Sequence, residues 1–155
     1  KRRFFRSLVT SSPAAALRQA SSERMEAISL WFPPGISHSE DVETDPFKPD
    51  DFVNPETLER LEVVGRVIDA LTATIGSEPQ WYLHLIAVRP ESMNKGYSSR
   101  LVQPILTQAQ EAGLPCTLIT QSAENVRKYE HWGFRVVREM PVSGSLEKFY
   151  SMRVD

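Results

Sequence analysis

Residues 81–102 read WYLHLIAVRPESMNKGYSSRLV, which is an apolar run, a short polar loop and the start of a helical pattern. The run 81–88 has one polar interruption, His84, and such a run is typical of a central strand covered on both faces. A loop that contains Gly96 and opens a helix presents backbone N–H groups and the positive end of the helix dipole. The stretch therefore predicts a strand, a loop and a helix that together seat an anionic ligand.

The loop from Asn94 to Ser99 has further features that suit a phosphate. Lys95 adds positive charge, and the hydroxyl groups of Ser98 and Ser99 can donate hydrogen bonds. The loop matches neither the Walker A pattern nor the GxGxxG pattern of dinucleotide-binding proteins. A glycine between a strand and a helix also fits an ordinary turn, so the loop alone leaves both interpretations open.

The next stretch, residues 116–134, predicts a second strand and helix. CTLIT at 116–120 is a short buried strand, and a helix follows from Ala123 to Trp132. Ser122 is placed to cap the start of this helix, and Gly133 suits a left-handed residue at its end. The order strand, loop, helix, strand, helix predicts an α/β arrangement in which the loop and the second helix lie near each other.

Two polar residues of this second helix, Asn125 and Tyr129, stand four positions apart. Residues at this spacing share one helix face, so an amide and a phenol could meet the same ligand. The alternative is that Tyr129 packs with Val126 and Trp132 as part of the core. The spacing by itself favours core packing.

The segments before residue 81 and after residue 133 complete a predicted mixed sheet flanked by helices. MEAISLWF at 25–32 alternates as a strand does, and Asn54-Pro55 opens an amphipathic helix that ends before Gly76. FRVVREM at 134–140 and LEKFYSMRV at 146–154 predict two strands joined by Pro141 to Ser145. The fold class predicted from the residues is α/β with a mixed sheet, in one domain over 1–155.

Three segments leave alternatives open. KRRFFRSLV at 1–9 fits a packed amphipathic helix better than a membrane anchor, because it is short. Ser12-Pro13 could start a helical turn through Leu17, or Leu17 to Ala20 could form one arm of a hairpin that turns at Ser21 and Ser22. The acidic segment from Ile36 to Asn54 reads as a solvated loop, and a lid that attracts a cationic substrate is its alternative.

Composition restricts the class of protein. The chain has 155 residues, 41% of them hydrophobic, and a formal charge of -2, which gives no overall basic field for nucleic acid. No apolar run is long enough to cross a bilayer, and we expect no membrane partner. Cys116, the single cysteine, sits in a predicted buried strand, so we expect an inert thiol and a cytoplasmic protein. His38, His84 and His131 show no metal-ligand spacing, and no metal is expected.

VRPESMNKGYSSRLV followed by NVRKYEHWGF resembles the acetyl-CoA-binding core of the GNAT superfamily of N-acetyltransferases. That family's loop reads Arg/Gln-x-x-Gly-x-Gly/Ala, and its later helix often reads Asn-x-x-x-Tyr-x-x-x-Gly-Phe. The second pattern is met in full, from Asn125 to Phe134. In the first, Gly96 matches, Met93 stands where Gln or Arg is usual, and Ser98 replaces the last small residue.

The resemblance covers residues 81–139 most strongly and implies a mixed, mostly antiparallel sheet with a splayed central strand. The family's first strand has no counterpart in the sequence, which opens on Lys1, and we expect a segment to precede it. The implied ligand is acetyl-CoA (coenzyme A), with an amine acceptor, in a monomer or homodimer. The positions that the resemblance assigns to the cofactor are Ile86, Ala87, Val88, Met93, Asn94, Lys95, Gly96, Tyr97, Ser98, Ser99, Asn125 and Tyr129.

The resemblance also implies roles in the reaction. Ile86 to Val88 would pair with the pantetheine arm, the loop amides would bind the pyrophosphate, and Tyr129 would protonate the departing thiolate. His84 is our candidate for the base that deprotonates the amine, because its side chain titrates near neutrality beside the splay. A half-buried histidine bonded to a neighbour is the alternative. A CoA-binding module without transfer and a non-enzymatic α/β interaction domain are the alternatives for the whole protein.

Overall fold

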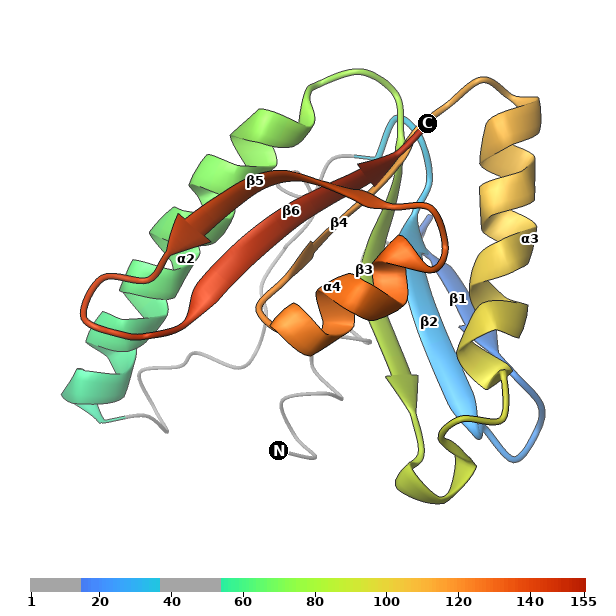
Figure 1. Ribbon diagram of the computed structural model, residues 1–155, viewed down its shortest axis with the longest axis horizontal. Coiled ribbons are helices and arrows are strands. Elements are labelled where there is room, and N and C mark those ends of the chain that lie inside the picture. The colour runs from blue at the N-terminus through green and yellow to red at the C-terminus, as the bar shows by residue number, and fades with distance from the viewer. Residues whose placement is uncertain (1–14, 37–53) are drawn as a thin grey trace.

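The computed structural model describes residues 15–36 and 54–155. In these ranges six strands form one sheet in the order β1-β2-β3-β4-β6-β5 (Figure 1). The strands are β1 (Leu17–Ala20), β2 (Ala27–Phe32), β3 (Trp81–Val88), β4 (Cys116–Thr120), β5 (Arg135–Pro141) and β6 (Lys148–Val154). The helices are α2 (Pro55–Ile75), α3 (Tyr97–Glu111), α4 (Ala123–Glu130) and the short 3-10 helix η2 (Pro90–Ser92).

The sheet is mixed and mostly antiparallel, as predicted. Within the described ranges the pairing of β3 with β4 is parallel, and the other four pairings are antiparallel. The parallel pairing is short: it joins Trp81–Leu83 to Cys116–Leu118 and then stops. Beyond it β3 continues to Val88 beside β2, whereas β4 continues to Thr120 beside β6, so the two central strands part (Figure 1). The predicted splay of the central strand is confirmed.

A β-bulge lies at the start of this splay. Leu30 of β2 faces Leu85, but the next residue, Trp31, faces Leu83, so His84 is an extra residue in β3. A bulge bends its strand and increases the local twist. The bulge therefore stands at the position where β3 leaves β4.

Helices cover opposite faces of the sheet. Leu118 of β4 belongs to the cluster that packs under α3, and the next residue, Ile119, packs with the cluster that α2 covers. Consecutive strand residues point to opposite faces, so α2 and α3 lie on opposite sides, as Figure 1 shows. The α3 cluster contains Trp31, Trp81, Leu83, Val102, Ile105, Ala109, Cys116, Leu118, Phe134 and Met152.

The helix starts follow the local sequence. Asn54 caps α2, with its side-chain oxygen accepting from the Thr57 N–H at 2.9 Å, and Ser122 caps α4 by accepting from the Asn125 N–H at 3.3 Å. These caps confirm the predicted helix starts. The predicted end of α4 at Trp132 is wrong, because α4 ends at Glu130 and the Trp132 N–H bonds the Tyr129 carbonyl in a tighter turn. Gly133 follows with φ 91°, the left-handed conformation expected after a helix.

Near the N-terminus the hairpin alternative is confirmed. Leu17–Ala20 is β1, which pairs with β2, and the Ser21 N–H closes the turn on the Ala27 carbonyl at 2.9 Å. A helical turn reaching Leu17 is therefore wrong. The predicted strands β5 and β6 are confirmed, although Pro141 lies at the end of β5 and the connection runs over 142–147. The predictions for 1–9 and for most of the acidic segment lie outside the described residues.

No helix in the described part of the chain is long and apolar enough to cross a membrane.

Leu71 tests how far the packing of α2 supports the sheet. Its side chain is fully buried with Val67, Val142 and Phe149. We expect Leu71→Ala to lower the free energy of unfolding by about 2–5 kcal/mol, measured by urea denaturation, because the truncated side chain leaves a cavity. Leu61→Ala on the same helix is the control, since Leu61 is 46% exposed and its loss should cost far less. Equal losses for the two variants would contradict the described position of α2.

Candidate active site

A groove of about 1010 Å³ opens where β3 and β4 part. Its walls come from three segments far apart in the sequence: the end of β3, the loop that leads into α3, and α4. The lining residues are Ile86, Ala87, Val88, Ser92, Met93, Asn94, Gly96, Tyr97, Ser98, Ser99, Glu124, Asn125, Arg127, Lys128, Tyr129, His131 and Trp132. Every cofactor position predicted from the sequence is among them except Lys95.

The β3 wall offers backbone groups. An antiparallel ladder uses the N–H and C=O groups of alternate residues. The Arg89 N–H bonds the Glu26 carbonyl at 2.8 Å, so by alternation Leu85 and Ala87 also face β2. The N–H and C=O groups of Ile86 and Val88 then face the opposite edge, with which no strand of the described ranges pairs. This edge can bond an extended, amide-containing ligand.

The loop wall is shaped by two left-handed residues. Asn94 has φ 60° and Gly96 has φ 75°, and together with η2 they turn the chain from β3 into α3. The Lys95 ammonium donates to the Glu91 carbonyl at 2.8 Å, so Lys95 closes the loop from outside the groove. No side chain of the described residues caps α3, and a helix start leaves its first N–H groups without intrahelical acceptors. These groups and the helix dipole are the features that an anion would need at this loop.

The α4 wall supplies side chains. Asn125 and Tyr129 both line the groove, which confirms that they share a face. The Tyr129 ring also makes edge-on contacts with Trp132 and Phe134, at 5.7 Å and 6.1 Å between ring centroids. Tyr129 therefore packs against its neighbours as well as lining the groove. The Trp132 indole N–H donates to the Ser99 Oγ at 3.1 Å and thereby ties the end of α4 to the start of α3.

Burial affects the Tyr129 phenol. It raises the pKa of Tyr129 above the ordinary value for tyrosine. The hydroxyl group therefore keeps its proton throughout the physiological range and remains available to donate it to a group that approaches it.

The outer rim of α4 is basic. Arg127, Lys128 and His131 line the groove, and Lys128 is held by Glu124 at 2.8 Å. Arg127 lies on the exposed part of the helix. Because Glu124 neutralises Lys128, Arg127 is the residue that gives this rim a net positive charge beside the start of α3.

His84 lies outside the groove lining. Its ring packs at 5.0 Å from Phe32 and 6.2 Å from Tyr82, on the side of the sheet that also holds Leu85. The outer part of the side chain stays exposed, while the protein packed around the rest removes water and lowers the pKa of His84. The imidazole is therefore neutral at pH 7 and able to accept a proton.

Several residues in or near the groove were not predicted from the sequence. Burial raises the pKa of Tyr82 to about 12, and the nearby Tyr129 phenol adds to this rise. Tyr82 alternates with Leu83 along β3, but its approach to Tyr129 depends on tertiary structure. Trp132 could have been predicted as a groove residue, since it stands three residues after Tyr129, a spacing that puts two residues on one helix face. Cys116, as predicted, is an inert thiol: it is 1% exposed and burial raises its pKa to about 12.

Comparison with known proteins places this groove in a family context. The model of the acetyltransferase (GNAT) family matches residues 22–134. An uncharacterised N-acetyltransferase of Schizosaccharomyces pombe is 37% identical over 54 residues, which are 35% of this chain and 22% of that protein. The chain thus spans about a fifth of the length of this relative.

Solved structures share the fold at low sequence identity. The structure described as histone acetyltransferase HPA2 and related acetyltransferase from Corynebacterium glutamicum has a TM-score of 0.58 and 16% identity, covering 98% of this chain and 71% of that one. The ribosomal-protein-S18-alanine N-acetyltransferase of Escherichia coli has a TM-score of 0.53 and 14% identity, covering 96% and 74%. At these identities the likeness shows the fold.

Gly96 and Gly65 give a paired test of the loop. A Cβ at either position meets no atom within 4 Å, so only the backbone conformation distinguishes them. We expect Gly96→Ala to lower the free energy of unfolding by about 1–2 kcal/mol, because φ is 75° there. Gly65→Ala, inside α2, should raise it by roughly 0.5–1 kcal/mol. Denaturant melts check both signs, and a stabilising Gly96→Ala would contradict the loop geometry.

Proposed function

Since the chain belongs to the GNAT family of acetyltransferases, we propose that it transfers an acetyl group from acetyl-CoA to a primary amine of a small molecule or peptide. One observation carries this proposal. The open edge of β3, the uncapped start of α3 and the Tyr129 phenol line a single groove. Each of these groups suits a different part of one long ligand.

The residues present fit acetyl-CoA. Its pantetheine arm contains amides, which match the N–H and C=O groups that Ile86 and Val88 leave open. Its pyrophosphate is a double anion, which matches the N–H groups at the start of α3 and the basic rim on α4. Met93 and Ser98 depart from the family's loop pattern, but the anion site is built from backbone N–H groups, which these side chains do not replace.

Acetyl-CoA would supply an acetyl group already activated as a thioester. The protein would bind and orient the two substrates and would transfer the protons. The N–H groups on the open edge of β3 are fixed by the sheet, so they can polarise a carbonyl oxygen without reorganising. Asn125 would orient the arm across the groove.

Tyr129 is the proposed general acid. Its Oη keeps a proton because burial raises its pKa, and it lies on the groove wall opposite β3. A phenol is a weaker acid than a thiol, with ordinary pKa values of about 10 and about 8.5, so the position of Tyr129 matters more than its acidity.

His84 is the proposed general base. The bulge puts it where the splay begins, and its ring lies beside Phe32 rather than in the groove lining. An amine that approaches from this side would meet the neutral imidazole, which can take its proton at a ring nitrogen. Acetyl donor and amine acceptor would then reach the open strand edge from different sides.

Ligand binding and Tyr129→Phe together test the proposed function. Saturation with acetyl-CoA at 100 times the dissociation constant should stabilise the protein by about 2.7 kcal/mol, seen as a higher melting temperature. Tyr129→Phe should then lower kcat by about 10²–10⁴-fold in a thiol-release assay with an amine panel, with acetyl-CoA affinity nearly unchanged. Tyr150→Phe, which removes a phenol outside the groove, is the matched control.

The possible results separate the candidate functions. If acetyl-CoA causes no thermal shift, both functions that require CoA are excluded, and a non-enzymatic α/β interaction domain is the remaining candidate. If acetyl-CoA causes a thermal shift but no amine is acetylated, the protein is a CoA-binding module without transferase activity. If Tyr129→Phe keeps full turnover, Tyr129 is not the general acid, although the protein is still an acetyltransferase.

The pH profile tests His84. Burial lowers the pKa of His84 from its ordinary value of 6.5, so the base form predominates at pH 7 and is lost as the pH falls through this lowered pKa, below 6.5. We expect kcat/KM of the wild type to fall in that acidic range. In His84→Gln this inflection should disappear, with an activity loss that is largest near neutral pH and shrinks at alkaline pH, where the amine deprotonates unaided.

His131→Gln controls for the removal of a histidine, and it should keep the acidic inflection. An unchanged inflection in His84→Gln would overturn the role of His84 as base.

A further inference from the structure

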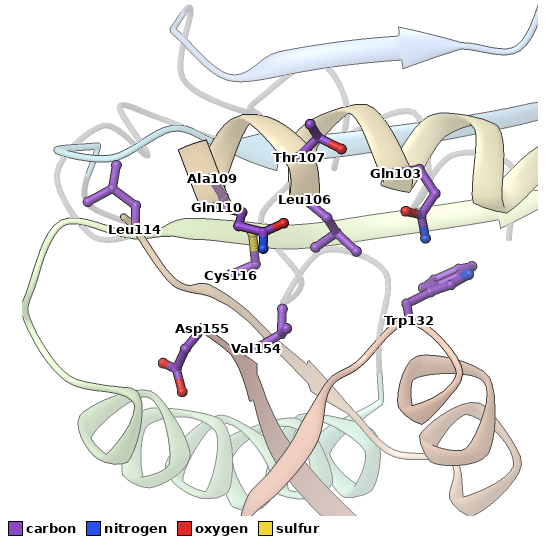
Figure 2. A pocket seen from close by; sticks show the side chains of 10 residues that line it. All are labelled: Gln103, Leu106, Thr107, Ala109, Gln110, Leu114, Cys116, Trp132, Val154 and Asp155. Carbon is purple, nitrogen blue, oxygen red and sulfur yellow. The ribbon is translucent and has the colours of Figure 1, made fainter. Parts of the chain in front are cut away.

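A second, smaller cavity lies beside the groove. It has a volume of about 250 Å³ and is bounded by α3 on one side and by β4, β6 and the turn after α4 on the other (Figure 2). Its lining mixes amide and hydroxyl groups on α3 with apolar side chains, among them Gln103, Leu106, Thr107, Gln110 and Cys116. Trp132 lines both this cavity and the groove, so the two spaces meet at its indole.

The Trp132 ring is held in place at this junction. Its N–H donates to the Ser99 Oγ at 3.1 Å, and its ring and the Tyr129 ring meet edge-on with 5.7 Å between their centroids. The side chain is nonetheless only half-buried. A flat aromatic surface that is fixed and partly accessible is a stacking platform for another ring.

Gln103 faces this platform from α3. It is exposed, it follows Ser99 by one helical turn, and its amide points toward Trp132 in Figure 2. A primary amide presents a donor and an acceptor side by side, the pattern that pairs with the N6 and N7 edge of adenine. Stacking of a base on an aromatic side chain contributes about 1–3 kcal/mol.

We propose that the junction of Trp132 and Gln103 binds the adenine ring of coenzyme A, an inference that rests on the proposed function. The pyrophosphate site is the first turn of α3, and Gln103 lies four residues beyond Ser99, a rise of about 6 Å. Adenosine joins the pyrophosphate directly through its ribose. The pantetheine arm therefore runs from the start of α3 toward β3, and the adenine runs the other way, along α3 to Trp132.

The experiment divides the cofactor into two probes. Adenosine 3′,5′-bisphosphate carries the base without the arm, and 4′-phosphopantetheine carries the arm without the base. Trp31 is 0% exposed and Trp81 is 7% exposed, so a base that quenches tryptophan fluorescence by contact must act on Trp132. We expect adenosine 3′,5′-bisphosphate to quench the wild-type fluorescence and 4′-phosphopantetheine to leave it nearly unchanged.

Variants on α3 give the second readout. Gln103→Ala should weaken coenzyme A binding by about 3- to 10-fold in calorimetry, and Trp132→Leu by about 5- to 150-fold, because the stacking contribution is lost. Gln103→Ala should leave the affinity for 4′-phosphopantetheine unchanged, and Trp132→Leu should weaken adenosine 3′,5′-bisphosphate much more than 4′-phosphopantetheine. Gln108→Ala is the matched control, since Gln108 is an exposed glutamine on the same helix that does not line the cavity.

The outcomes separate this inference from the proposed function. Wild-type protein that binds coenzyme A with no quench by adenosine 3′,5′-bisphosphate, or with Gln103→Ala no weaker than Gln108→Ala, overturns the adenine site alone. Wild-type protein that binds neither coenzyme A nor either probe overturns the proposed function and the adenine site together. Equal weakening of both probes by Trp132→Leu would assign Trp132 a purely structural role and would also overturn the site.

Discussion

The site depends on the short parallel pairing between β3 and β4, which ends at Leu83 and Leu118. Up to that point the two strands form a continuous sheet over a packed core. Beyond it β3 stays with β2 and β4 stays with β6, so an unpaired strand edge opens in the middle of the sheet. An open edge inside a sheet costs hydrogen bonds unless a ligand or water supplies them. The bulge at His84 is the local irregularity that accompanies this change of direction.

The groove then gains its chemistry from elements that the splay brings together. The start of α3 supplies N–H groups that no side chain of the described residues caps, and α4 supplies Asn125 and Tyr129. The anion site that we propose consists mostly of backbone N–H groups, so the side chains of Met93 and Ser98, which differ from the usual family pattern, leave its donors in place. The hydrogen bond from Trp132 to Ser99 keeps the two helices at a fixed distance across the groove.

Local features of the fold were predictable because they depend on neighbouring residues. The caps at Asn54 and Ser122 and the left-handed Gly133 follow from side chains within three residues of each helix end. The bulge at His84 was not predictable, because it depends on the register between β2 and β3, more than fifty residues apart in the sequence. For the same reason the electrostatic effect of Tyr129 on the pKa of Tyr82 and the second cavity beside Trp132 could be found only in the tertiary structure.

Residue-resolved amide hydrogen exchange of β3 shows whether the splayed strand edge holds the pantetheine arm. The amides of Leu85 and Ala87 are directed to β2, whereas those of Ile86 and Val88 face the open edge. With saturating coenzyme A, we expect slower exchange at Ile86 and Val88 and little change at Leu85 and Ala87. Unchanged exchange at Ile86 and Val88 in protein that has bound coenzyme A would contradict this position of the arm.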